Sequence, residues 1–183
     1  MKRSFDWIVS FLAIIVLSPL FIIISLLILV DLGWPVIYKK RYPGLREQLF
    51  TMYRFRTMKN SIGDHGQHLR PNERLTRLGS FLKKYSLDDL PQFFNVLKGD
   101  MSLVGPRPVL IRSISSRDQT RLKRHSVRPG VTGWSQIHGQ KRLSWEEKFA
   151  LDLYYVEHQS LAFDLKIMGL SLLQLFGWKR SVS

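Results

Sequence analysis

The chain has 183 residues with 28 Lys or Arg against 14 Asp or Glu, which gives a formal net charge of +14 at pH 7. The length allows one ordinary domain, and an apolar fraction of 45% excludes a disordered chain. The absence of cysteine excludes disulfides and thiolate chemistry and fits a reducing compartment, while the charge predicts an anionic partner: nucleic acid, a membrane surface or a phosphorylated substrate.

Residues 7–30 contain no charged side chain and are long enough to form a helix that crosses a bilayer. Basic residues flank both ends, at positions 2–3 and 39–41, and short membrane segments carry such residues on their cytoplasmic side. In the middle, Pro19 removes a backbone donor and can kink a helix, and the hydroxyl of Ser18 can bond the freed carbonyl. An ordinary spanning helix with a tolerated proline is one interpretation. The two basic flanks favour a helical hairpin that enters and leaves by the same face.

The chain after this segment has a mixed pattern. Residues 36–40 and 48–58 alternate in polarity and predict two short strands joined through the Pro43-Gly44 turn. Residues 61–71 are rich in glycine and polar side chains and predict a loop, whose two histidines are not expected to bind a metal. Apolar residues then recur at helical spacing and predict a helix over 73–85.

The last third of the chain alternates between loop and helix signals. Segments 104–110 and 127–134 each combine proline with glycine and predict rigid loops. A serine followed by two acids predicts the start of a helix over 144–158. Residues 163–180 have the pattern of an amphipathic helix that lies at a membrane interface.

Two adjacent acids, Asp88 and Asp89, are unusual in so basic a chain. Pro91 fits a helix only in its first turn, so a helix is expected to begin near these acids and to end before Gly99. Both carboxylates would then lie at the helix N-terminus, where the helix dipole favours negative charge. Ser86 and Asp89 also have the spacing of a capping box.

The acidic pair has two interpretations. The two carboxylates could simply cap the helix, but this explains neither the need for two acids nor the lysines that precede them. Alternatively, one carboxylate is a nucleophile toward phosphorus and the other holds Mg²⁺, while nearby Lys and Arg side chains bind phosphate oxygens. The chain contains no phosphate-binding glycine loop, H-E-x-x-H, G-x-S-x-G or D-x-D motif, so the pair is the best candidate for a catalytic centre.

Five segments resemble the bacterial sugar transferase family. They are KRSFDWIVS with LSPL, MYRFRTM, SLDDLPQFFNVLKGDMSLVGPRP, VRPGVTGWSQIHG and SWEEKFALDLYYVEH, in the family's order from about Lys2 to Met168. The resemblance is to the minimal monotopic phosphoglycosyl transferases. It implies an α+β, mainly helical fold in which residues 1–34 form a re-entrant membrane helix broken at Ser18-Pro19. Residues 35–183 would form a small cytosolic catalytic domain with interfacial helices.

The resemblance also implies an activity and a location. Family members transfer a phospho-sugar from a UDP-sugar to undecaprenyl phosphate at the cytoplasmic face of the bacterial inner membrane, and thereby begin surface glycan synthesis. The reaction is ping-pong and releases UMP first. By the family motif, Asp88 matches the nucleophile and Asp89 matches the ligand of Mg²⁺, with Asp88 beside the metal. Membrane lipids are expected partners, nucleic acid is not, and a homodimer is compatible with the sequence.

Basic residues of these motifs are the expected binders of substrate phosphates: Arg54, Arg56, Lys83, Arg107 and Arg128. Several positions depart from the common family pattern, namely Asp89 for Glu, Lys83 for Arg, Arg54 for Lys, and His138 with Gln140 for Asn and Arg. We interpret these differences as tuning of substrate choice. A membrane scaffold without catalysis and a nucleic-acid-binding protein are the rival classes. The scattered basic residues disfavour the second.

Overall fold

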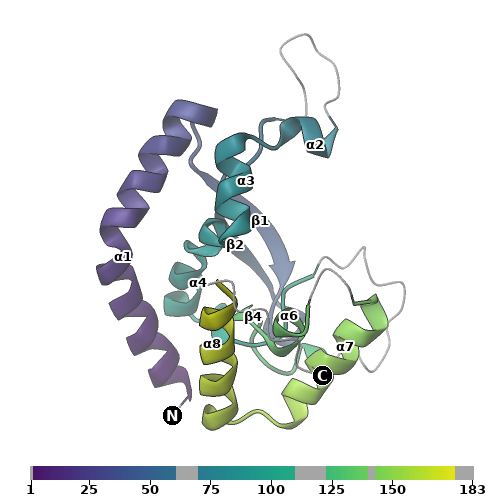
Figure 1. Ribbon diagram of the computed structural model, residues 1–183. Coiled ribbons are helices and arrows are strands. Elements are labelled where there is room, and N and C mark those ends of the chain that lie inside the picture. The colour runs from purple at the N-terminus through teal and green to yellow at the C-terminus, as the bar shows by residue number, and fades with distance from the viewer. Residues whose placement is uncertain (1, 61–69, 110–122, 140–142, 176–183) are drawn as a thin grey trace.

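The computed structural model describes residues 2–60, 70–109, 123–139 and 143–175. In chain order its elements are α1 (Lys2–Leu32), β1 (Ile37–Pro43), η1 (Leu45–Glu47), β2 (Leu49–Phe55), α2 (Pro71–Arg74), α3 (Arg77–Lys84), η2 (Leu87–Asp89), α4 (Gln92–Lys98), β3 (Ser102–Val104), β4 (Gly130–Thr132), α6 (Trp134–Ile137), α7 (Trp145–Glu157) and α8 (Leu161–Leu175) (Figure 1). The predicted α+β class with mainly helical content is confirmed. The predictions for residues 61–69, for Gln140 and for the chain beyond residue 175 lie outside the described residues.

Helix α1 runs without interruption through Ser18 and Pro19. The hydroxyl of Ser18 donates to the carbonyl oxygen of Ile15 at 2.8 Å, within the turn that precedes the proline. Figure 1 shows the helix bending about its middle. The structure therefore has one bent helix where the sequence predicted a helical break, and the re-entrant topology stays a prediction.

Both ends of α1 are attached to the same globular part of the protein. At the N-terminal end, Lys2 donates to the hydroxyl of Tyr155 at 3.1 Å and forms an ion pair with Asp164. At the C-terminal end, the guanidinium of Arg56 donates to the carbonyl oxygen of Leu32 at 3.2 Å. Because one folded unit holds both ends, the position of the whole helix relative to that unit is fixed.

Strands β1 and β2 form the predicted antiparallel hairpin, in a register that places Tyr38 opposite Arg54. Asn95 of α4 attaches the hairpin to the rest of the fold. Its side chain is fully buried, accepts a hydrogen bond from the amide of Tyr53 at 3.0 Å and donates to the carbonyl oxygen of Thr51 at 2.7 Å. These bonds satisfy buried polar groups on both partners and fix β2 against α4.

The helix predicted over 73–85 is interrupted, so this detail of the prediction was wrong. Leu75 is extended because it forms an isolated antiparallel bridge with Met58, which separates α2 from α3. Thr76 then caps α3 by accepting a hydrogen bond from the amide of Gly79 at 2.9 Å. A Cβ on Gly79 would lie 2.0 Å from the carbonyl oxygen of Thr57, so only glycine allows α3 to pack so closely on the chain after β2.

The sequence analysis missed two short strands: β4 lies inside the loop predicted over 127–134, and β3 ends at Val104, where the other predicted loop begins. Strands β3 and β4 pair in parallel, with Ser102 opposite Gly130. The backbones of the two segments touch, because a Cβ on Gly130 would lie 2.1 Å from the amide nitrogen of Gly105. This contact anchors the start of the Pro-Arg-Pro turn that follows Gly105.

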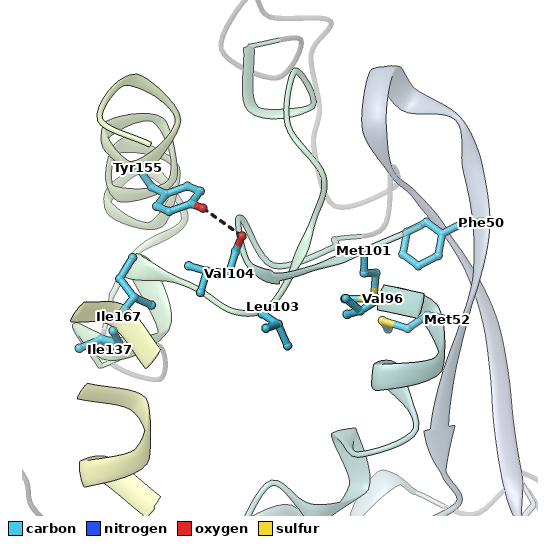
Figure 2. Close-up of a cluster of buried hydrophobic side chains, with 9 residues drawn as sticks. All are labelled: Phe50, Met52, Val96, Met101, Leu103, Val104, Ile137, Tyr155 and Ile167. Carbon is cyan, nitrogen blue, oxygen red and sulfur yellow. Dashed lines mark hydrogen bonds between the residues drawn. The ribbon is translucent and has the colours of Figure 1, made fainter. Parts of the chain in front are cut away.

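The main core joins the hairpin to the C-terminal helices. Figure 2 shows its nine buried side chains: Phe50, Met52, Val96, Met101, Leu103, Val104, Ile137, Tyr155 and Ile167. The hydroxyl of Tyr155 donates to the carbonyl oxygen of Val104 at 3.0 Å (Figure 2). A second cluster packs the C-terminal half of α1 against the hairpin and α3, through Ile24, Ile28, Val36, Phe55 and Leu82.

The start of α7 matches its prediction. Ser144 accepts a hydrogen bond from the amide of Glu147 at 3.2 Å, and the Glu147 carboxylate accepts one from the amide of Ser144 at 2.7 Å. Helix α8 then begins at Leu161, two residues before the predicted segment. Its exposed apolar side chains include Leu165 and Leu172, which fits the predicted interfacial character.

Candidate active site

The acidic pair lies in η2, a single turn of 3-10 helix that precedes α4. The predicted capping box is wrong, because Ser86 adopts the left-handed conformation with φ 55° and its side chain caps nothing. Helix α4 begins only at Gln92, with Pro91 at its N-cap. The positive φ turns the chain between α3 and η2 and leaves Asp88 and Asp89 just before the N-terminus of α4.

Asp89 is held by residues from three parts of the fold. The Arg54 Nε atom of β2 lies 2.9 Å from its Oδ1 atom, although the N–H is not directed at that oxygen, so the contact is an ion pair without a hydrogen bond. The Arg107 Nη2 atom of the Pro-Arg-Pro turn lies 3.6 Å from Oδ2. The side-chain amide of Gln92 also donates to Oδ1. Toward the described residues, both arginines use only part of the five N–H donors of a guanidinium.

Asp88 is buried, with 9% of its surface exposed, and within the described residues it has no ion-pair partner. Burial and the neighbouring Asp89 raise the pKa of Asp88 above its ordinary value. The charges of Arg54 and Lys83 and a backbone hydrogen bond oppose this increase. Burial also lowers the pKa of Lys83, against the attraction of Asp88. The Asp88 carboxylate therefore has cations around it, but none of them occupies its oxygens.

Only three of the five predicted phosphate binders gather at this pair: Arg54, Lys83 and Arg107. Arg56 lies at the end of α1, where it donates to carbonyl oxygens that include that of Trp34 at 3.1 Å. The Arg128 Nε atom donates to the carbonyl oxygen of Gly99 at 2.8 Å, at the C-terminus of α4. Both therefore neutralise helix C-termini, and the structure does not bring them to the acids.

Four residues near the site were missed by the sequence analysis: Gln92, Arg124, Ser135 and Asp152. The Arg124 Nε atom donates to Asp152 at 2.7 Å, Ser135 donates to the same carboxylate at 2.7 Å, and Arg124 also donates to the carbonyl oxygen of Arg107. This buried network fixes the backbone of the Pro-Arg-Pro turn. The sequence did offer a signal for Asp152, which stands among apolar residues in the middle of a predicted helix. An acid is rarely buried without a partner, so such a position indicates a buried ion pair.

The pair offers a limited set of metal ligands. Across the residues that the structure describes, no three His, Cys, Asp or Glu side chains come together. Mg²⁺ is commonly held by one or two carboxylates, with the remaining positions filled by substrate phosphates and water. Among the described residues no cation pairs with the Asp88 carboxylate, and the Oδ2 atom of Asp89 has only the 3.6 Å contact with Arg107. These two carboxylates fit a Mg²⁺ ion that the substrate helps to bind.

Comparison with known proteins gives a family for this geometry. The model of the bacterial sugar transferase family matches residues 1–177. The uncharacterised sugar transferase EpsL of Bacillus subtilis is 41% identical over 172 residues, which cover 94% of this chain and 85% of that protein. The exopolysaccharide production protein ExoY of Sinorhizobium fredii is 37% identical, with 91% of this chain and 81% of that protein covered.

The chain also matches one part of a larger relative. The UDP-glucose:undecaprenyl-phosphate glucose-1-phosphate transferase of Escherichia coli is 34% identical over 96% of this chain, but the match covers only 40% of that protein. The family match spans η2, the Pro-Arg-Pro turn and α7 together, so it includes every element that builds the acidic site. The chain therefore belongs to the bacterial sugar transferase family.

Proposed function

We propose that this protein transfers a phospho-sugar from a UDP-sugar to undecaprenyl phosphate and releases UMP. The observation that carries the proposal is the buried Asp88 carboxylate, which has no ion-pair partner among the described residues and lies beside an Asp89 that two arginines hold. Two relatives act on a UDP-sugar and undecaprenyl phosphate by name, those of Escherichia coli and Aeromonas hydrophila. The product, polyprenyl diphosphate-sugar, would begin the synthesis of a surface glycan.

In the first half of the reaction, an Asp88 oxygen attacks the β-phosphorus of the UDP-sugar. A P–O bond forms to Asp88, the bond to the bridging oxygen breaks, and UMP leaves with the electron pair. Arg54 and Arg107 have donors free to bind the diphosphate oxygens, and Lys83 adds positive charge beside Asp88. Mg²⁺, held by Asp89 and Asp88 with the phosphates, would supply further charge neutralisation.

In the second half, an oxygen of undecaprenyl phosphate attacks the phosphorus of the aspartyl phospho-sugar. The bond from phosphorus to Asp88 breaks, and the carboxylate returns to its starting state. Each half transfers the phosphoryl group between oxygens and requires no redox partner. The burial of Asp88 limits water access to the intermediate, which would otherwise hydrolyse.

We also propose a membrane location at the cytoplasmic face, and the apolar surface of α1 supports the membrane part of this proposal. Its most apolar stretch is only 11% buried, which is unlike the core helix of a soluble protein. Since one globular unit holds Lys2 at one end and the Leu32 carbonyl at the other, both ends of α1 lie on the same side of the protein. That attachment favours a helix that enters and leaves by one face of the bilayer, with Ser18 and Pro19 at its deepest point.

A screen of UDP-sugars tests the proposal. The purified protein in lipid discs with undecaprenyl phosphate and Mg²⁺ is expected to release UMP from at least one UDP-hexose or UDP-N-acetylhexosamine. A donor labelled in the sugar, supplied without the acceptor, should label Asp88 covalently. Failure of every UDP-sugar to give UMP would contradict the activity. Turnover with the label recovered on another residue would contradict the role of Asp88.

A further inference from the structure

A small cavity lies between the Pro-Arg-Pro turn and the N-terminal half of α7. Its volume is about 150 Å³, and its walls include Arg107, Pro108, Trp145, Lys148, Phe149 and Asp152. The proposed phosphoryl transfer gives this cavity no role. It is joined to them through Arg107, whose guanidinium reaches to 3.6 Å from Asp89.

The cavity is built on a rigid base. The side chains of Arg124 and Asp152 are each only 3% exposed and form an ion pair, and Ser135 donates to the same carboxylate. Since Arg124 also holds the carbonyl oxygen of Arg107, this network fixes α7 against the Pro-Arg-Pro turn. A buried network with satisfied partners keeps the shape of the cavity constant.

The walls combine aromatic and charged groups. The Lys148 ammonium lies 4.9 Å from the centre of the Trp145 ring, and the Arg124 guanidinium lies 5.3 Å from the centre of the Phe149 ring. Cation–π contacts at these distances restrain both rings. A ligand that suits such walls has an apolar face for the aromatic rings and several hydroxyl or amide groups for the charged ones.

The volume restricts the ligand to one ring. A cavity of about 150 Å³ accommodates a molecule of the size of benzene. It therefore has room for one six-membered ring, of a sugar or of a pyrimidine, and not for a complete nucleotide-sugar. The polyprenyl chain is excluded as well, because Figure 1 shows the N-terminal half of α7 on the side of the molecule opposite α1.

The order of the groups in the donor selects between the hexose and the uracil. In a UDP-sugar the hexose is bonded through one oxygen to the β-phosphorus that Asp88 attacks. The uracil is separated from that phosphorus by the ribose and the α-phosphate. A cavity that begins at Arg107, the residue that contacts Asp89, lies within reach of the nearer group.

We propose that this cavity binds the hexose ring of the donor and thereby discriminates between UDP-sugars. The inference rests on the proposed function, since it assigns the sugar of that reaction to a place. Trp145 and Phe149 contact the ring, Lys148 and Arg107 bond its hydroxyl groups or its phosphate, and the Arg124–Asp152 network holds the wall in position.

Kinetics of the first half-reaction test the assignment. The Trp145→Ala variant is expected to raise the KM for the best UDP-sugar at least tenfold. The variant should also discriminate less between this UDP-sugar and the others. Inhibition by UMP, which has the base but no hexose, should change less than twofold. Tyr154→Ala is the matched control, because Tyr154 lies on the same helix outside the cavity and has 47% exposure against 48% for Trp145.

The outcomes separate the alternatives. Equal weakening of UMP inhibition and of UDP-sugar binding in Trp145→Ala would assign the cavity to uracil and overturn the inference. An unchanged KM and an unchanged preference among UDP-sugars in both Trp145→Ala and Lys148→Met would overturn the inference too. The proposed function would stand in that case, provided that the wild type releases UMP. Absence of UMP release by the wild type with every UDP-sugar would instead remove the proposed function, and the hexose site with it.

Discussion

The acidic site at η2 and the Arg124–Asp152 pair on α7 both place carboxylates against arginines, but the two regions differ in what remains unpaired. Arg124 and Asp152 are each only 3% exposed, and Ser135 and the Arg107 carbonyl take up further hydrogen-bonding capacity of the pair. At η2 the side chains of Arg54 and Asp89 are 23% and 14% exposed, and Asp88 has no ionic partner among the described residues.

We interpret this difference as the one between a structural ion pair and a site that can react. A closed network pairs its own charges and stabilises one backbone geometry. Arginines with free donors beside a carboxylate with free oxygens can receive an anionic diphosphate and a nucleophilic attack. We therefore expect variants of the two regions to fail in opposite ways, the first in stability and the second in activity.

Replacement of Asp88, the proposed nucleophile, should have the largest effect. Asp88→Asn is expected to lower UMP formation from a UDP-sugar on the order of 10⁴-fold or more, because the amide cannot form the covalent intermediate. Its melting temperature should stay the same or rise, since burial and Asp89 raise the pKa of Asp88 and so make the ionised form unfavourable in the folded state. UMP assays and thermal unfolding in the same lipid discs measure both quantities. A variant that unfolds at a clearly lower temperature would assign Asp88 a structural role.

Replacement of an acid in the buried Arg124–Asp152 pair should instead lower stability. Asp152→Ala leaves the Arg124 guanidinium buried without its partner and is expected to lower the free energy of unfolding by about 3–5 kcal/mol. Denaturant titration in detergent measures the change. Glu157→Ala on the same helix is the control, because Glu157 pairs with Lys123 at the surface and its loss should leave unfolding unchanged. Equal effects of the two variants would show that Asp152 is no more structural than a surface acid.

The sequence was sufficient where the signal is local. The hairpin follows from alternation around Pro43-Gly44, and the start of α7 follows from the spacing of Ser144 and Glu147. Contacts distant in sequence were not predictable in this way. The Met58–Leu75 bridge divides a continuous helical pattern, and β3 pairs with β4 across the chain because glycines allow the two backbones to touch.

The same limit applied to the site. The adjacent acids indicated a candidate centre without any contact information. The structure places Arg56 away from the acids, although Arg56 lies two residues after Arg54 and alternate residues of a strand face the same side. Strand β2 ends at Phe55, so the chain turns and delivers Arg56 to the end of α1. Where a strand ends depends on packing, which motif spacing does not contain.

The two arginines offer a smaller and more direct test of the comparison. Arg56→Ala is expected to lower the free energy of unfolding by about 1–3 kcal/mol, because carbonyl groups at the end of α1 lose a charged donor. Arg54→Ala should instead reduce UMP formation about 10–100-fold, with less loss of stability. Parallel unfolding and activity measurements separate the effects. A lower activity without destabilisation in Arg56→Ala would return Arg56 to the phosphate-binding residues.

The pH dependence of the first half-reaction gives the smallest effect. Protonated Asp88 cannot attack phosphorus, so the rate should be lost as pH falls through the pKa of Asp88. Burial and Asp89 place this pKa above the ordinary value of 3.8, so the acid limb should lie at higher pH than that of an ordinary aspartate. The stability contributed by Asp88 changes in the opposite direction. It is fully present below the ordinary pKa and is lost as pH rises through the raised pKa.

A charge change beside Asp88 should displace this limb. The positive charge of Lys83 lowers the pKa of Asp88, so Lys83→Gln is expected to move the acid limb of UMP formation to higher pH. Lys84→Gln is the matched control, because Lys84 neighbours Lys83 on α3, while Lys83 is the lysine whose charge lowers the pKa of Asp88. The rates should be measured with the UDP-sugar alone, since the phosphate of the acceptor titrates near pH 6. If the limb coincides in wild type and Lys83→Gln, the titrating group is not Asp88, and the acidic site loses the property that distinguishes it from the buried pair.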